Sequence, residues 1–165
     1  MCNIDSRKLI LRSMREDDVE RAVAIAAVSL PQDKLNEQEF WIHLTLPNHF
    51  ALVAELDSEV VGFMLYEKIK GELYLAYIAV DSTYRGLGAG RTMIVWLQKE
   101  LSALSRTIIA LHVSALNQPA LHLYESLGFK RVGSVPGHCP DGTDAIEMVF
   151  SQKSNYVRPA SLHVG

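Results

Sequence analysis

A glycine-rich segment with two arginines is the part of this sequence whose chemistry is easiest to state. The segment Arg85-Gly86-Leu87-Gly88-Ala89-Gly90-Arg91 follows an apolar run and opens an amphipathic one, so it joins a predicted strand to a predicted helix. The start of a helix presents unpaired backbone N–H groups and a partial positive charge, which suit phosphate oxygens. Glycines allow close approach of the backbone, and arginines add charged donors. The segment therefore predicts an anion-binding loop.

The same loop has other interpretations. It could be a tight turn whose glycines only satisfy unusual backbone angles. It lacks the Lys-Ser/Thr ending of a Walker A loop. It also differs from the dinucleotide-binding fingerprint near the start of a Rossmann unit, because three strands in meander order are predicted before it. A nucleotide-binding domain is therefore disfavoured.

Further residues with chemical potential lie on both sides of the loop. Asn117 and Tyr124 are seven residues apart, close to two helical turns, so they share one face of a helix. Glu72 and Tyr74 alternate onto one face of a strand, and His112 lies on another strand. A tyrosine, with a reference pKa near 10, stays protonated at neutral pH and can act as an acid. Three of these residues also have a purely structural interpretation. Tyr124 could be a packed tyrosine, His112 a buried, hydrogen-bonded histidine and Glu72 a turn carboxylate.

Hydrophobic periodicity predicts the elements that position these residues. Strands are expected near residues 8–12, 50–56, 60–68, 72–80, 107–113, 129–135 and 144–150, and helices near 18–30, 36–46, 88–104 and 117–127. Antiparallel strands thus lead into a β-α-β unit. The expected class is α+β: a single domain with a mixed central sheet flanked by about four helices.

The bulk properties agree with one globular domain, expected over residues 1–150 with a tail at 151–165. The chain has 165 residues, 48% apolar and 21% charged, and a net charge of −3, which disfavours a nucleic-acid-coating protein. No signal peptide or membrane-spanning stretch is evident, so a cytoplasmic location is expected. The two cysteines, Cys2 and Cys139, make no disulfide framework. His138 and Cys139 are expected to lie in a substrate-side loop, since no second metal-ligand cluster accompanies them.

Two blocks resemble the GNAT N-acetyltransferase superfamily. The loop matches the pattern Arg/Gln-x-x-Gly-x-Gly/Ala with Arg85, Gly88 and Gly90, and the segment LYLAYIAVDSTYRGLGAG resembles the family's central strand and pyrophosphate loop. The second block, LHVSALNQPALHLYESLGFKRVG, resembles the following strand, helix and strand. The resemblance covers about residues 8–150 and is strongest from 72 to 133. It implies a sheet whose two central strands, 72–80 and 107–113, splay apart to admit the pantetheine arm of acetyl-CoA.

The resemblance also implies roles for individual residues. Acetyl-CoA is the expected co-substrate, without a metal, and its expected binding residues are Ile78, Ala79, Val80, Arg85, Gly86, Leu87, Gly88, Ala89, Gly90, Arg91, Asn117, Ala120 and Tyr124. Tyr124 would donate a proton to the leaving thiolate. Glu72, or a pair formed by Tyr74 and His112, would serve as the base, and a similar Leu-His-Val element with a strand tyrosine occurs in some protein N-terminal acetyltransferases.

The expected reaction is acetyl transfer from acetyl-CoA to a primary amine by direct attack in a ternary complex. The acceptor stays open at this stage: a small-molecule amine, a lysine side chain or a protein N-terminus. No nucleic-acid or membrane partner is expected, and a homodimer is plausible. The alternative is a non-catalytic acyl-CoA-binding or sensing module that keeps the same fold.

Overall fold

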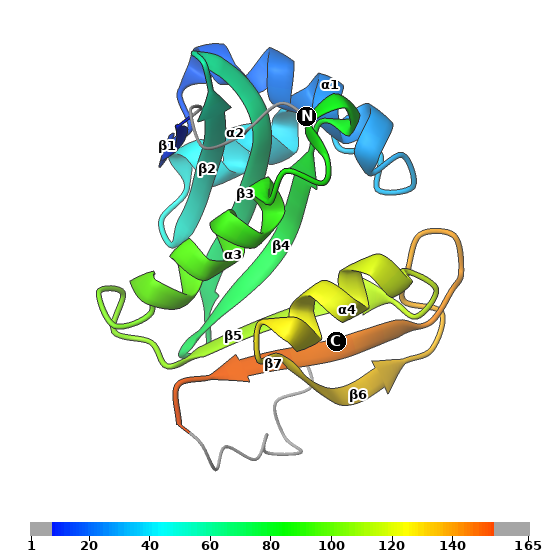
Figure 1. The fold of residues 1–165 in the computed structure, drawn as a ribbon. Coiled ribbons are helices and arrows are strands. Elements are labelled where there is room, and N and C mark those ends of the chain that lie inside the picture. The colour runs from blue at the N-terminus through cyan, green and yellow to red at the C-terminus, as the bar shows by residue number, and fades with distance from the viewer. Residues whose placement is uncertain (1–7, 154–165) are drawn as a thin grey trace.

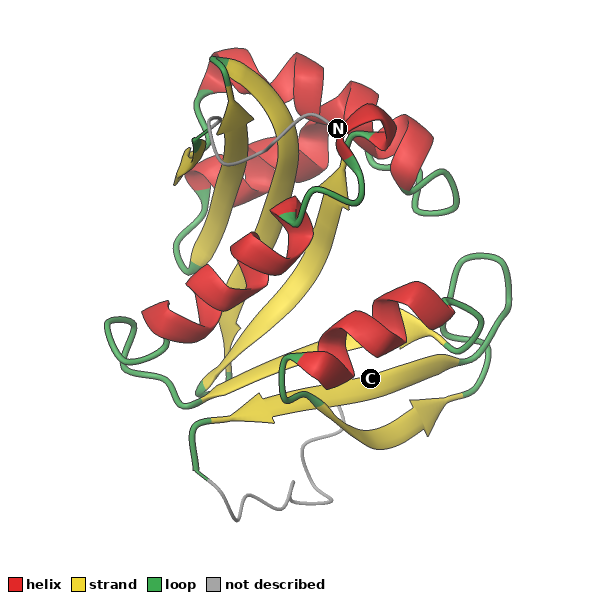
Figure 2. Cartoon of the chain, in the orientation of Figure 1, coloured by secondary structure: helices red, strands yellow, loops and turns green. Residues whose placement is uncertain are grey.

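The computed structural model describes residues 8–153, and these residues form one mixed sheet with helices on both faces (Figures 1 and 2). Cys2 and residues 154–165 of the predicted tail lie outside the described part. In chain order the elements are β1 (Leu9–Ser13), η2 (Glu16–Asp18), α1 (Val19–Ser29), α2 (Glu37–Thr45), β2 (His49–Leu56), β3 (Glu59–Ile69), β4 (Glu72–Val80), η3 (Ser82–Tyr84), α3 (Ala89–Glu100), β5 (Ile108–Ser114), α4 (Gln118–Ser126), β6 (Lys130–Val135) and β7 (Ala145–Ser151).

Within residues 8–153 the sheet has seven strands in the order β1-β2-β3-β4-β5-β7-β6. Among these described strands, only β4 and β5 pair in parallel, and the other neighbours are antiparallel. The α+β class and the element order expected from the sequence are confirmed. One helix differs from its prediction: α3 ends at Glu100 rather than near Leu104, and residues 101–105 form a turn in which the Leu104 N–H donates to the Glu100 carbonyl and Ser105 has a left-handed φ of 56°.

Two hydrophobic clusters hold the helices against the sheet. On one face α3 and α4 pack Met93, Leu97 and Leu121 against the strands. On the other face α1 and α2 contribute Ala22, Ile25 and Phe40. These side chains are almost completely buried, and burying a large apolar side chain stabilises the fold by about 1.5–3 kcal/mol. The sheet is therefore a fixed platform between two helical layers.

The parallel pair at the centre of the sheet is short. Leu73–Leu75 of β4 pair with Ile109–Leu111 of β5, and beyond this point β4 stays with β3 while β5 continues beside β7. Figure 1 shows the two strands diverging, with α3 over β4 and α4 over β5 and β7. The predicted splay of the central strands is thus confirmed.

A bulge lies within β4 just where this divergence begins. In the pairing with β3, Tyr66 lies opposite Leu75 and Leu65 opposite Tyr77, so Ala76 is an extra residue. Before the bulge, odd-numbered residues such as Leu73 and Leu75 belong to the cluster under α3 and α4. After it, the even-numbered Ile78 and Val80 pack against that cluster. The extra residue therefore exchanges the two faces of β4 midway along the strand.

Candidate active site

The glycine loop lies at the N-terminus of α3, as predicted. Gly86 and Gly88 have positive φ angles of 78° and 82°, which side chains with a Cβ adopt at a cost. Gly88 is the N-cap of α3 and supplies no capping side chain, whereas Asn36 and Asn117 cap α2 and α4 through their side-chain oxygens. Because no side chain covers the first turn of α3, its N–H groups suit an anion such as a pyrophosphate.

The two loop arginines contact the protein itself. Arg85 donates from Nη2 to Ser29 Oγ at 2.9 Å and from Nε to the Val80 carbonyl at 3.4 Å. Arg91 donates from Nη1 to Ser126 Oγ at 3.1 Å and so links α3 to α4. An anion would have to compete for these guanidinium groups, whereas within residues 8–153 the backbone N–H groups of Gly86, Leu87 and Gly88 donate to no other backbone group. The loop backbone is therefore more available to an anion than the two arginine side chains are.

The predicted cofactor strand lies beside the point where β4 and β5 separate. Ile78, Ala79 and Val80 pair with β3 on one edge only, because the β4–β5 pairing within residues 8–153 ends at Leu75. Gly62 of β3 lies directly against this segment, since a Cβ there would stand 2.9 Å from the Ala79 carbonyl oxygen. The edge of β4 that faces the opening can therefore offer backbone groups to a ligand, as an extended pantetheine arm would require.

The predicted α4 residues occupy two different environments. Asn117 is the N-cap of α4, and its Oδ1 accepts from the Ala120 N–H at 3.2 Å, so its amide nitrogen is not part of that bond. Tyr124 is only 7% exposed, packs 5.5 Å from the Phe129 ring and belongs to the cluster under α3 and α4. Burial raises the pKa of Tyr124 to about 12, so its hydroxyl keeps its proton at neutral pH. That is the form a general acid needs.

Tyr74 and His112 meet on the opposite face of the sheet. The Tyr74 hydroxyl lies 2.7 Å from His112 Nδ1, and the ring centres are 5.7 Å apart. Burial, followed by the charge of Glu67, raises the Tyr74 pKa to about 12. Tyr74 is therefore a phenol that can donate to Nδ1 when His112 carries its proton on Nε2. The pairing of these two side chains, expected from the sequence, is observed.

Carboxylates surround this pair. Glu67 lies directly across from Tyr74 in the β3–β4 register, and Glu147 lies across from His112 in the β5–β7 register. Both carboxylates contribute to the raised pKa of Tyr74. Glu72, the other predicted base, is buried at the start of β4 opposite Ile69. It shares the face of Tyr74, and its catalytic role stays a prediction.

Two loops face each other over this side of the sheet. His138, in the loop between β6 and β7, stacks on His112 with ring centres 4.7 Å apart and planes 30° apart. In the same loop, the charge of Asp141 adds to burial in raising the pKa of Asp33, which follows α1. The two loops therefore lie close enough for the charges of Asp33 and Asp141 to interact.

Sequence reasoning missed Glu67 and Glu147 and gave His138 no role beyond its loop. Glu67 and Glu147 each interrupt an apolar run, in VVGFMLYEKI and AIEMVF, which is the signal that could have found them. The stacking of His138 on His112 had no such signal, because it depends on how a loop folds back onto a strand 26 residues earlier in the chain.

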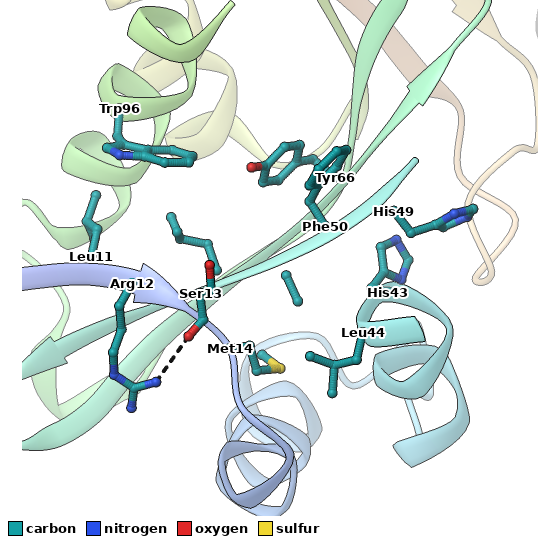
Figure 3. A pocket seen from close by; sticks show the side chains of 12 residues that line it. Leu11, Arg12, Ser13, Met14, His43, Leu44, His49, Phe50, Tyr66 and Trp96 are labelled. Carbon is teal, nitrogen blue, oxygen red and sulfur yellow. Dashed lines mark hydrogen bonds between the residues drawn. The ribbon is translucent and has the colours of Figure 1, made fainter. Parts of the chain in front are cut away.

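A cavity of about 420 Å³ lies at the edge of the sheet where β1 ends (Figure 3), and its lining residue His49 lies 3.1 Å from Glu67 between Nε2 and Oε2. Its lining includes His43 and His49 on one side and Tyr66 and Trp96 on another. None of the predicted site residues lines it. Among residues 8–153 no three His, Cys, Asp or Glu side chains are grouped to hold a metal, and no helix is long and apolar enough to cross a membrane. The expected independence from metals stays a prediction.

Comparisons with known proteins agree with this geometry. The sequence profile of the Acetyltransferase (GNAT) family matches residues 11–129. An N-alpha-acetyltransferase of Sulfurisphaera tokodaii is 31% identical over 155 residues, which cover 84% of this chain and 90% of the relative. The crystal structure of the ribosomal-protein-S18-alanine N-acetyltransferase of Escherichia coli superimposes with a TM-score of 0.77 at 25% identity, covering 91% of this chain and all of the other.

A further solved structure shows the same fold with the co-substrate bound. NAA60 of Arabidopsis thaliana in complex with acetyl-CoA has a TM-score of 0.79 at 21% identity, covering 88% of this chain and 99% of the other. The alternative of a non-catalytic acyl-CoA-binding module is not favoured, because relatives that match over most of their length are acetyltransferases. The chain belongs to the Acetyltransferase (GNAT) family, and it transfers an acetyl group from acetyl-CoA to an amine.

Proposed function

We propose that the acceptor is the α-amino group of a protein or peptide N-terminus, and that Tyr74 and His112 remove its proton. The hydrogen bond of 2.7 Å between these two side chains is the observation that carries the proposal. It stands on the sheet face opposite α3 and α4, next to the point where β4 and β5 separate. The N-alpha-acetyltransferase of Sulfurisphaera tokodaii, to which the chain is similar over most of its length, supports the same acceptor class.

The proposed chemistry is a direct attack of the amine on the thioester carbonyl. An N–C bond forms, the C–S bond breaks, and CoA leaves as a thiolate that takes a proton from the Tyr124 hydroxyl. The proton of the amine passes to the Tyr74 oxygen while the Tyr74 proton moves to His112 Nδ1. A backbone N–H group on the open edge of β4, within the segment from Ile78 to Val80, would bind the carbonyl oxygen, where negative charge develops.

An α-amine suits this weak base better than a lysine side chain does. At pH 7, deprotonating an α-ammonium group with a pKa near 8 costs about 1.4 kcal/mol, while a lysine with a pKa near 10.4 costs about 4.6 kcal/mol. Tyr74 is held as a neutral phenol by its surroundings. It can therefore relay a proton but cannot act as a strong base, so an acceptor of which about a tenth is already neutral at pH 7 is favoured.

The carboxylates around the pair support a cationic acceptor. Glu67 and Glu147 lie beside Tyr74 and His112 on the sheet, and Asp33 and Asp141 lie on the two loops above it. Negative charge on several elements attracts the ammonium form of an N-terminus and raises its local concentration. The remaining sequence-based expectations (a cytoplasmic location, a homodimer, and no nucleic-acid or membrane partner) stay predictions.

A peptide panel tests the acceptor class. Peptides with free N-termini of Ala, Ser, Gly and Met are compared with N-blocked peptides containing one lysine and with spermidine, following CoA release and locating the acetyl group by mass spectrometry. We expect kcat/KM for the best free N-terminus to exceed that for lysine peptides and spermidine by at least about tenfold, a difference of about 1.4 kcal/mol. Preferential acetylation of spermidine or of the lysine side chain would overturn the proposal.

A further inference from the structure

The ring of His138 covers the ring of His112. The ring centres are 4.7 Å apart and the planes are inclined by 30°, so the two rings are in close, tilted contact. Tyr74 contacts the same imidazole at its edge, through the hydrogen bond to Nδ1. An imidazole on a strand can rotate about its χ2 angle, which is broad for aromatic side chains. The stack restricts that rotation.

The loop that carries His138 is tied down close to His112. Within the loop, the Gly137 N–H donates to Asp144 Oδ1 at 3.0 Å, and the Cys139 N–H donates to the Thr143 carbonyl at 3.1 Å. At the end of β5, three residues after His112, the Ala115 N–H donates to the Asp144 carbonyl at 2.9 Å. These bonds hold the loop against β5, and none of them uses the His138 side chain.

We infer that His138 is a positioning residue: its stacked ring holds His112 in the orientation in which Nδ1 accepts the Tyr74 hydrogen bond. The inference rests on the proposed function, in which the Tyr74–His112 pair removes the proton of the acceptor. Charged groups that face the pair come from β3, as Glu67, and from β7, as Glu147. Glu67 and Glu147 act on the pair through their charge, whereas His138 restricts the orientation of the His112 imidazole ring.

Two variants of His138 distinguish the ring contact with His112 from other roles of the loop. His138→Ala removes the stacking surface, and His138→Phe restores a flat ring without imidazole nitrogens. His122→Ala, on the exposed side of α4, is the matched control. We expect His138→Ala to lower kcat by about five- to tenfold with the acceptor KM within twofold, His138→Phe to recover at least half of the lost kcat, and the control to match the wild type.

Nitrogen-15 NMR of the imidazole groups gives a readout that needs no substrate. In the wild type we expect His112 as the Nε2–H tautomer, with the signal assigned by its loss in His112→Gln. His138→Ala should give a mixture of tautomers, and His138→Phe should keep the wild-type tautomer. An unchanged His112 signal in His138→Ala would overturn the inference, as would an increase in KM alone, which would make His138 a contact of the acceptor. If the wild-type protein acetylates no N-terminus while the His138 variants show these NMR changes, the proposed function is refuted and the positioning role is supported.

Discussion

The Tyr74 hydroxyl lies 2.7 Å from His112 Nδ1, although the two residues are 38 positions apart in the chain. Because the pair is proposed to relay one proton, removing either member should interrupt the same step. We expect Tyr74→Phe and His112→Gln each to lower kcat by about 10²-fold, in the range of general acid–base catalysis. The double variant should be no more than a few times slower than either single variant, since residues that act as a unit are not additive. Independent, multiplicative losses would refute the relay.

Tyr124 is proposed to protonate the leaving thiolate, and its burial keeps it a phenol. Tyr124→Phe keeps the ring against Phe129 and removes only the hydroxyl. We expect kcat to fall by about 10²-fold while the Kd for acetyl-CoA, measured calorimetrically, stays within twofold. An unchanged kcat would remove Tyr124 from the acid role, and a weakened Kd would make it a binding residue.

Gly88 and Gly90 differ in what a methyl group would do at each position. Gly88 has a φ of 82°, so Gly88→Ala should strain the start of α3 by about 1–2 kcal/mol. Gly90 lies in the helix, where a Cβ would meet only a Val80 methyl group at 3.8 Å. We expect Gly88→Ala to weaken acetyl-CoA binding by at least about tenfold, or about 1.4 kcal/mol, and Gly90→Ala to bind as the wild type does. Isothermal titration calorimetry with both variants checks this, and equal affinities would argue against the loop as the pyrophosphate site.

Gly62 allows β3 to lie close to the Ala79 backbone. A Cβ at position 62 would stand 2.9 Å from the Ala79 carbonyl oxygen, and backbone cannot move aside as a flexible side chain can. We expect Gly62→Ala to lower the free energy of unfolding by about 1–3 kcal/mol in urea titrations. Gly133→Ala, where the nearest atom beyond the neighbouring residues is a Glu147 side-chain oxygen at 3.6 Å, is the matched control and should stay close to wild type.

Stability at alkaline pH should report the buried tyrosines. Burial raises the pKa of Tyr66, Tyr74 and Tyr124 to about 12, above the value of about 10 expected in the unfolded chain. Above pH 10 the unfolded state loses these protons first and is favoured. Stability should therefore be constant from pH 8 to 9.5 and fall between pH 10 and 12. Thermal unfolding checks this, with a shallower fall expected for Tyr124→Phe; a parallel fall in that variant would contradict the assignment.

Local patterns predicted much of this molecule. The glycine loop and the periodicity of apolar residues are short-range signals, and each element is found close to where it was expected. The meeting of Tyr74 and His112 could be anticipated because both lie on the same face of neighbouring strands. Glu67, Glu147 and His138 could not be placed, since their positions depend on strand register and on a folded loop. The engagement of Arg85 by Ser29 likewise depends on the packing of α1 beside the end of β4.

The extra residue at Ala76 gives the two halves of β4 opposite facings. In a regular strand of the same sequence, Tyr74 and Ile78 would share one face, because their numbers differ by four. With the bulge, Tyr74 lies on the face opposite α3 while Ile78 and Val80 pack toward α3. Deleting Ala76 would make Leu75 and Tyr77 consecutive opposite Tyr66 and Leu65, so a regular strand one residue shorter would keep these side chains on their present faces. The spacing between Tyr74 and Ile78 is therefore matched to the bulge, and an intact set of motifs in a regular strand of the present length would not present the proposed proton relay and the proposed thioester site as they lie here.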